Sequence, residues 1–115
     1  MLISVSPMYI VILITVGTRH EGLKIARALV EEGLAACVNI AGGIDSVYRW
    51  EGKVEEGREW LLIAKTEDRL LGRVTARVRE LHSYEVPEII ALRVEGGYQG
   101  YLDWVGESVA TGANK

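Results

Sequence analysis

The chain has 115 residues, of which 49% are hydrophobic and 25% charged, and its formal net charge is −3. This length suits one domain with a single core, spanning residues 1–115, and the composition excludes a disordered protein. A net negative charge argues against nucleic-acid binding, which usually needs a basic face. Cys37 is the single cysteine, so no disulfide can form within the chain, and we expect a reducing, cytoplasmic location.

The first apolar segment, Tyr9 to Val16, is rich in β-branched residues on both of its faces. This pattern predicts a central strand. It is too short to span a membrane as a helix, and no positive charge precedes it, as a signal peptide would require. We therefore expect no membrane partner, and we interpret residues 1–7 as a loose leader with Met8 as an alternative start.

A first helix is predicted after this strand. Thr18 suits its N-cap, and Glu21 three residues later would complete a capping box. Apolar residues then recur at helical spacing as far as Val30, and Gly33 suits the end of the helix.

The middle of the chain predicts a long hairpin. Its first arm comprises residues 34–40 and 44–50, and the side chains of residues 44–50 alternate with the period of a strand. The return arm comprises residues 53–66. Glu51-Gly52 is a two-residue turn between the arms. Gly42-Gly43 and Gly57 are expected to mark bends or bulges.

The last third of the chain predicts a helix, a strand and a further helix. Asp68 is expected to cap the second helix, and Pro87 predicts a loop because it disfavours a helical residue before it. The predicted segments are a helix to residue 81, a loop at 84–87, a strand at 88–94, a helical stripe at 98–109 and a polar tail at 111–115.

This order of elements, β-α-β-β-α-β plus a terminal helix, indicates an α+β fold. A split βαβ arrangement predicts a four-stranded antiparallel sheet with two helices on one face. The other face would remain largely uncovered, although its strands are apolar. Burial of apolar surface gains roughly 25 cal/mol per Å², so the pattern itself predicts that copies of the chain associate.

Several spaced motifs between Tyr9 and Val109 together resemble the CutA family of divalent-cation tolerance proteins. They are Leu34-Ala35-Ala36-Cys37-Val38-Asn39, Tyr48 with Trp50-Glu51-Gly52-Lys53, Lys65-Thr66, His82 with Tyr84, Val86-Pro87-Glu88-Ile89 and Tyr101-Leu102-Asp103-Trp104. The resemblance implies a ferredoxin-like homotrimer, with clefts between subunits like those of nitrogen-regulatory PII proteins. It implies a link to tolerance of copper and other divalent cations, and neither a reaction nor an organic cofactor.

Cys37 and His82 are the candidate metal ligands. As a thiolate, Cys37 suits Cu(I), but its apolar neighbours equally suit a buried small hydrophobe. The resemblance implies a copper-binding histidine where His82 stands, and the alternative is a cation that favours a helix C-terminus. One Cys and one His do not complete a metal site, so symmetry-related copies would have to supply the other ligands.

A second candidate site resembles the cleft between subunits in the family. A strand-borne lysine beside carboxylates and aromatic rings could bind a small anion, although structural ion pairs would use the same residue types. Three functions therefore stay open: a metal-binding trimer, a PII-like sensor of a small anionic metabolite, and a structural trimer with a protein partner. The predicted cleft residues are Tyr48, Trp50, Glu59, Lys65, Tyr84, Glu85 and Glu88.

Overall fold

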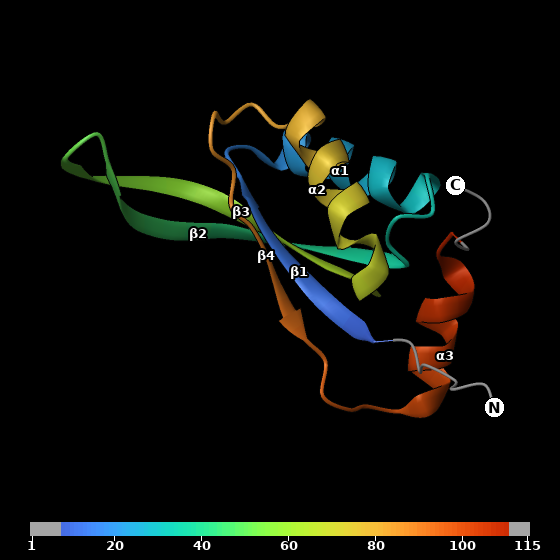
Figure 1. The fold of residues 1–115 in the computed structure, drawn as a ribbon. Coiled ribbons are helices and arrows are strands. Elements are labelled where there is room, and N and C mark those ends of the chain that lie inside the picture. The colour runs from blue at the N-terminus through green and yellow to red at the C-terminus, as the bar shows by residue number, and fades with distance from the viewer. Residues whose placement is uncertain (1–7, 111–115) are drawn as a thin grey trace.

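The structure is a computed structural model that describes residues 8–110, so the predicted leader at 1–7 and tail at 111–115 lie outside the described residues. It has the predicted α+β architecture, with one four-stranded antiparallel sheet in the order β2-β3-β1-β4 (Figure 1). The strands are β1 (Tyr9–Val16), β2 (Cys37–Trp50), β3 (Lys53–Glu67) and β4 (Ile89–Arg93). The helices are α1 (Arg19–Glu31), α2 (Leu71–Leu81) and α3 (Gln99–Ser108).

Helices α1 and α2 pack side by side on one face of the sheet, as the pattern predicts (Figure 1). Alternate residues of β1, among them Ile12 and Ile14, point to this face and are fully buried. Among the described helices, none is long and apolar enough to cross a bilayer. The core between sheet and helices contains Ile10, Ile12, Ile14, Val16, Ile25, Leu29, Leu62, Ala64, Val74 and Val78.

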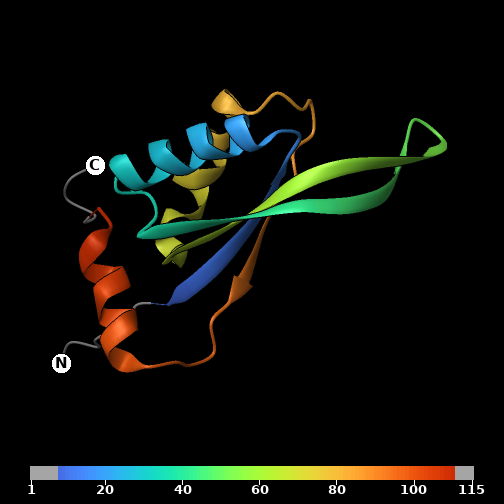
Figure 2. The ribbon, with the colours of Figure 1, turned by 180° about the vertical axis from the view of Figure 1, so that it is seen from behind.

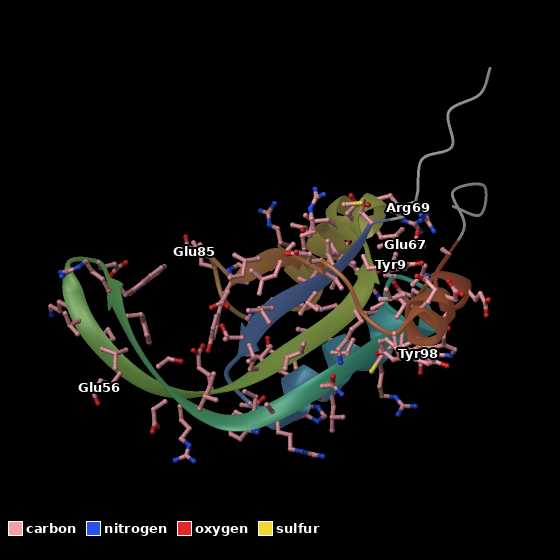
Figure 3. All side chains as sticks on the ribbon, turned by 90° about the horizontal axis from the view of Figure 1, so that it is seen from below. Tyr9, Glu56, Glu67, Arg69, Glu85 and Tyr98 are labelled. Carbon is pink, nitrogen blue, oxygen red and sulfur yellow. The ribbon has the colours of Figure 1, made fainter. Side chains whose placement is uncertain are left out.

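The opposite face of the sheet has no helix over its middle (Figure 3). Residues directly opposite one another in an antiparallel sheet share a face, and Leu13 of β1 pairs with Ile63 and Ile90. Ile90 is 51% exposed and Leu92 is 54% exposed. We call this surface, formed by Val11, Leu13, Leu61, Ile63, Ile90 and Leu92, the open face.

The ends of α1 show which capping predictions hold. Thr18 Oγ1 accepts the Glu21 N–H at 3.1 Å, so Thr18 is the N-cap. The predicted capping box is wrong in its second half, because the Glu21 carboxylate accepts the N–H and hydroxyl of Ser83 instead. Gly33 has φ +72° and Leu34 N–H bonds to Leu29 O, as in a Schellman motif.

The hairpin of β2 and β3 extends well beyond the body of the molecule (Figure 2). Its turn places Glu51 and Gly52 at positive φ, as a tight hairpin turn requires. A register shift confirms the predicted bulge at Gly42-Gly43, where the ring of Trp60 occupies the space that a Cβ on Gly42 would need. The register continues unbroken at Gly57, so no bulge forms there.

Asp68 does not cap α2, contrary to the sequence prediction. A 3₁₀ turn, η1 (Asp68–Leu70), precedes the helix and moves its N-cap to Leu70, which has no side-chain capping bond. The Asp68 N–H donates to Met8 O at 2.8 Å, so the chain is still tied to the start of β1 at this point.

Helix α3 is anchored at the end of the sheet by a buried carboxylate. Arg69 Nε donates to Glu67 at 2.5 Å, and the same guanidinium donates to the Ala110 carbonyl beyond α3 (Figure 3). Burial raises the pKa of Tyr9 beside this pair, and the Glu67 carboxylate raises it further. Gly106 of α3 lies close to Glu67 and Tyr9. A Cβ at this glycine would lie 3.0 Å from Glu67 Oε2 and 3.3 Å from Tyr9 Oη.

We therefore predict that Gly106→Ala destabilises the protein, whereas Gly72→Ala does not. Both glycines lie in helices, where alanine is intrinsically favoured, but a Cβ on Gly72 meets no atom within 4 Å. Gly106→Ala should be about 1–2 kcal/mol less stable than Gly72→Ala because Glu67 must move. Urea denaturation measures the difference, and equal stability of the two variants would contradict the anchor.

Candidate functional site

A cavity of about 580 Å³ lies between the outer half of the hairpin, next to its turn, and the segment that joins α2 to β4. Its walls contain six of the seven predicted cleft residues: Tyr48, Trp50, Glu59, Tyr84, Glu85 and Glu88. The other lining residues are Thr15, Ser46, Val47, Arg49 and Val86. We call this cavity the hairpin pocket. All of these residues belong to one chain.

The hairpin wall follows from strand alternation. Ser46 lies opposite Gly57 and Tyr48 lies opposite Glu55, so both share the face of the hairpin that carries Glu59. A Cβ on Gly57 would lie 3.7 Å from Tyr48 Oη, so the tyrosine ring lies close to the backbone of β3. This face continues into the open face, because Glu59 and Leu61 alternate on one side of β3.

The opposite wall is held by Tyr84. Its hydroxyl donates to Glu59 Oε2 at 2.8 Å and lies close to Gly17, where a Cβ would approach it to 3.2 Å. Burial is the main cause that raises the pKa of Tyr84, and the bond to Glu59 adds to it. The phenol therefore stays protonated and donates to Glu59.

His82 positions this wall and has no free ring nitrogen. Its side chain is fully buried. Because Tyr84 N–H points at Nδ1 at 3.1 Å, Nδ1 accepts, and Nε2 then carries the proton that it donates to Thr15 O at 2.7 Å. The Glu21 carboxylate accepts both donors of Ser83 beside it. We call these contacts the His82 latch; they fix the loop after α2 to α1 and β1.

The charges of the hairpin pocket are predominantly negative. The carboxylates Glu59, Glu85 and Glu88 share it with one guanidinium, that of Arg49. Within residues 8–110, Glu59 accepts from Tyr84, while Glu85, Glu88 and Arg49 make no side-chain hydrogen bond or ion pair. Glu85 lies on the loop that faces the concave side of the curved hairpin, and Glu56 lies on the outer side (Figure 3).

Lys65, the seventh predicted cleft residue, lies at the other end of the open face. It pairs with Cys37 across β3 and β2, and its ammonium donates to Asn39 Oδ1. Six residues along β3 separate it from Glu59, about 20 Å at the rise of a strand. The structure therefore does not bring the predicted lysine to the predicted carboxylates and rings.

The two candidate metal ligands are also apart. Cys37 is half-buried next to Tyr101, whose pKa is raised by burial and by the neighbouring thiol. His82 contacts Thr15, which pairs with Leu61 of β3, whereas Cys37 pairs with Lys65 of the same strand. Leu61 and Lys65 are four residues apart, which is about 13 Å at the rise of a strand. In the part of the chain that the structure describes, no three His, Cys, Asp or Glu residues come close enough to hold a metal ion.

Five lining residues are not among the predicted cleft residues. Ser46 alternates with Tyr48 and Trp50 in the first arm of the hairpin, so its period alone places it on the same face. Arg49 has the opposite phase, so alternation along β2 does not predict that it lines the pocket. The contribution of Thr15 depends on the path of the loop across the end of β1, for which the sequence contains no local signal.

We predict that His82 stabilises the loop rather than serving as a free ligand. His82→Phe keeps a ring but leaves the Thr15 carbonyl and the Tyr84 N–H without partners, which should cost about 2 kcal/mol or more in urea denaturation. His82→Gln retains a donor at the position of Nε2 and should lose less. Equal stability of wild type and His82→Phe would contradict the latch.

Comparison with known proteins gives a consistent answer. The family model described as CutA1 divalent ion tolerance protein matches residues 10–108. The divalent-cation tolerance protein CutA of Thermus thermophilus is 50% identical over 98 residues, which cover 85% of this chain and 95% of that protein. The chloroplastic CutA of Arabidopsis thaliana is 52% identical over 99 residues, or 86% of this chain. This chain spans only 54% of that plant relative's length.

Solved structures agree with the sequence relatives. The solved divalent cation tolerance protein of Thermus thermophilus has a TM-score of 0.88 at 48% identity, and the match covers 90% of this chain and 100% of that one. CutA1 of Oryza sativa has a TM-score of 0.87 at 47% identity, with 90% and 94% covered. By sequence and by structure, this chain belongs to the CutA1 divalent ion tolerance family.

Proposed function

We propose that this chain acts in tolerance to divalent cations as a non-enzymatic homotrimer that binds cations weakly in the hairpin pocket. The observation that carries the proposal is the excess of carboxylates, three against one guanidinium, in a cavity of about 580 Å³. Such an excess concentrates cations near the site and repels anions. The name of the Thermus relative, a divalent-cation tolerance protein, supports the same function.

The open face supports the trimeric part of the proposal. Ile90 and Leu92 are about half exposed on it, beside the partly exposed side chains of Leu13 and Ile63. A contiguous apolar surface of this kind favours association. Because the face that carries Glu59 continues into the open face, a copy packed there would border the hairpin pocket, which would then lie between subunits.

The donor atoms present in one chain suit weak binding of hard cations. Carboxylate oxygens are the ligands that Mg²⁺, Mn²⁺ and Ca²⁺ prefer, but Glu59 is already engaged by Tyr84. Cys37 is the only thiol of the chain, so binding of copper would require copies of Cys37 to meet across the assembly. His82 would have to break the latch to bind any metal.

The alternative of a sensor for a small anionic metabolite has less support from this geometry. It relied on Lys65, which lies outside the hairpin pocket beside Asn39. Arg49 is the one cationic group among the lining residues, and three carboxylates oppose it. A structural trimer with a protein partner would use the open face and leave the charges of the pocket without a role.

A cytoplasmic location is part of the proposal and rests on the single unpaired cysteine. The relatives differ in this respect, since the Arabidopsis protein is called chloroplastic and the solved Archaeoglobus fulgidus protein periplasmic. Fractionation of the source cells with an antibody against the chain tests it, and recovery in an exported fraction would contradict it.

For assembly, we predict that Leu92→Lys dissociates the trimer while Val30→Lys leaves it intact. Both residues are exposed apolar side chains, but Leu92 lies on the open face and Val30 lies on α1. A lysine inserted into the interface would be desolvated without a partner. Sedimentation equilibrium at micromolar concentration distinguishes the two, and a monomeric wild-type chain would overturn the trimer.

For cation binding, we predict that the double variant Glu85→Gln and Glu88→Gln weakens binding of Mn²⁺ by roughly tenfold. Glu56→Gln, on the outer side of the same hairpin, should change it less than about twofold. Mn²⁺ titration followed by water proton relaxation measures the affinities.

If Cu(I) binds to wild type and not to Cys37→Ser, the thiol is a ligand; if both bind equally, it is not.

A further inference from the structure

The His82 latch places two hydrogen-bond acceptors next to each other inside the fold. Nδ1 of His82 and Oε2 of Glu21 are 3.4 Å apart, and the two side chains are 0% and 16% exposed. The N–H of Ser83 donates to this carboxylate oxygen at 2.7 Å, and the N–H of Tyr84 donates to Nδ1 at 3.1 Å. Two consecutive amides are therefore divided between two neighbouring acceptors that have no proton between them.

The Glu21 carboxylate has no lysine or arginine partner in the described part of the chain. Within residues 8–110, both of its oxygens accept from Ser83, and no lysine or arginine lies within ion-pair distance. A carboxylate that is largely removed from water is costly unless an opposite charge lies near it. The His82 ring, at 3.4 Å, is the group placed to supply that charge.

The two helices that border the ring offer no competing partner. His82 is the C-cap of α2, where the helix dipole favours a positive charge. The charged residues of the last turn of α2, Arg79 and Glu80, are exposed to solvent. At the start of α1, Arg19 and His20 are exposed as well. Among the ionisable side chains of the two helices, only that of Glu21 therefore lies against Nδ1.

The strands and the loop contact the ring through groups that keep their charge state. The Thr15 carbonyl of β1 takes the Nε2 proton whether the ring is neutral or charged. Glu59 of β3 contacts the Tyr84 hydroxyl, and the Tyr84 ring centre lies 4.7 Å from that of His82. Burial raises the pKa of Tyr84, so the phenol stays protonated. Protonation at Nδ1 would therefore change only the contacts of Glu21 and of the Tyr84 amide.

We propose that the His82 latch is a proton-operated switch of the loop after α2. A proton taken up from solvent at Nδ1 makes this nitrogen a donor, and it then pairs with the Glu21 carboxylate. Such a charge-assisted bond is roughly twice as strong as a neutral one. The Tyr84 N–H loses its acceptor at the same moment, while Nε2 keeps its bond to Thr15. The backbone of Tyr84 is released, and with it the wall that this residue forms.

The chain has only two histidines, so NMR of labelled imidazole nitrogens tests the switch directly. The assembled wild type is followed from about pH 8 to about pH 5, the range in which imidazoles titrate, and His20→Gln assigns the signals. His82 should change from one protonated ring nitrogen to two. In the same pH interval the exchange protection of the Tyr84 amide should fall at least about tenfold, while that of Ile12 in β1 stays unchanged.

A pair of matched variants on α1 tests the partner of the proton. Glu21→Gln keeps an acceptor for Ser83 but removes the charge, so proton binding at His82 should weaken at least about tenfold. Glu31 pairs with Arg27 on the outside of the same helix and is 65% exposed. Glu31→Gln should therefore change proton binding less than about twofold. Sedimentation of the same samples reports whether assembly changes with pH.

Several results would overturn the switch. They are a His82 ring that stays neutral over the whole range, a ring that gains its proton while the Tyr84 amide stays protected, and equal proton binding in Glu21→Gln and wild type. Loss of Tyr84 protection only together with that of Ile12, or only on dissociation, would also overturn it. No step of this test uses a cation, so the switch and the proposed Mn²⁺ binding can fail separately.

Discussion

Strand β1 is apolar on both faces, and α1 and α2 cover only one of them. On the covered face, burial of side chains such as Ile12 and Ile14 is worth roughly 1.5–3 kcal/mol each, so the packing of the helices is strongly fixed. The other face keeps half-exposed side chains such as Leu92. The hairpin carries the same sheet beyond the body, so the surface available for association and the hairpin pocket lie on one continuous face.

The pocket exists because the loop after α2 is held in one place. A loop that crosses the end of a buried strand leaves backbone groups that need partners, and His82 supplies one to Thr15 and one to Tyr84. Tyr84 can then reach Glu59. Both ring nitrogens of the histidine that resembled a metal ligand are hydrogen-bonded in this structure, so it acts on the site through the loop.

The periodicity of the sequence was sufficient for the fold but only partly for the site. Alternation identifies the face of a residue and not its position along a strand, so Lys65 and Glu59 share a face and still lie far apart. Asp68 had a capping residue type, but the chain was still hydrogen-bonded to Met8 there. Tyr48 and Glu85 line one pocket only through the tertiary fold, and family resemblance, not local pattern, placed both at one cleft.

The pairing of Tyr84 with Glu59 bears on how any cation would be held. It occupies one of the three carboxylates, which leaves Glu85 and Glu88 as unpaired anions in the described pocket. Two exposed carboxylates leave most of the coordination of a divalent ion to water, so such an ion would bind weakly and leave quickly.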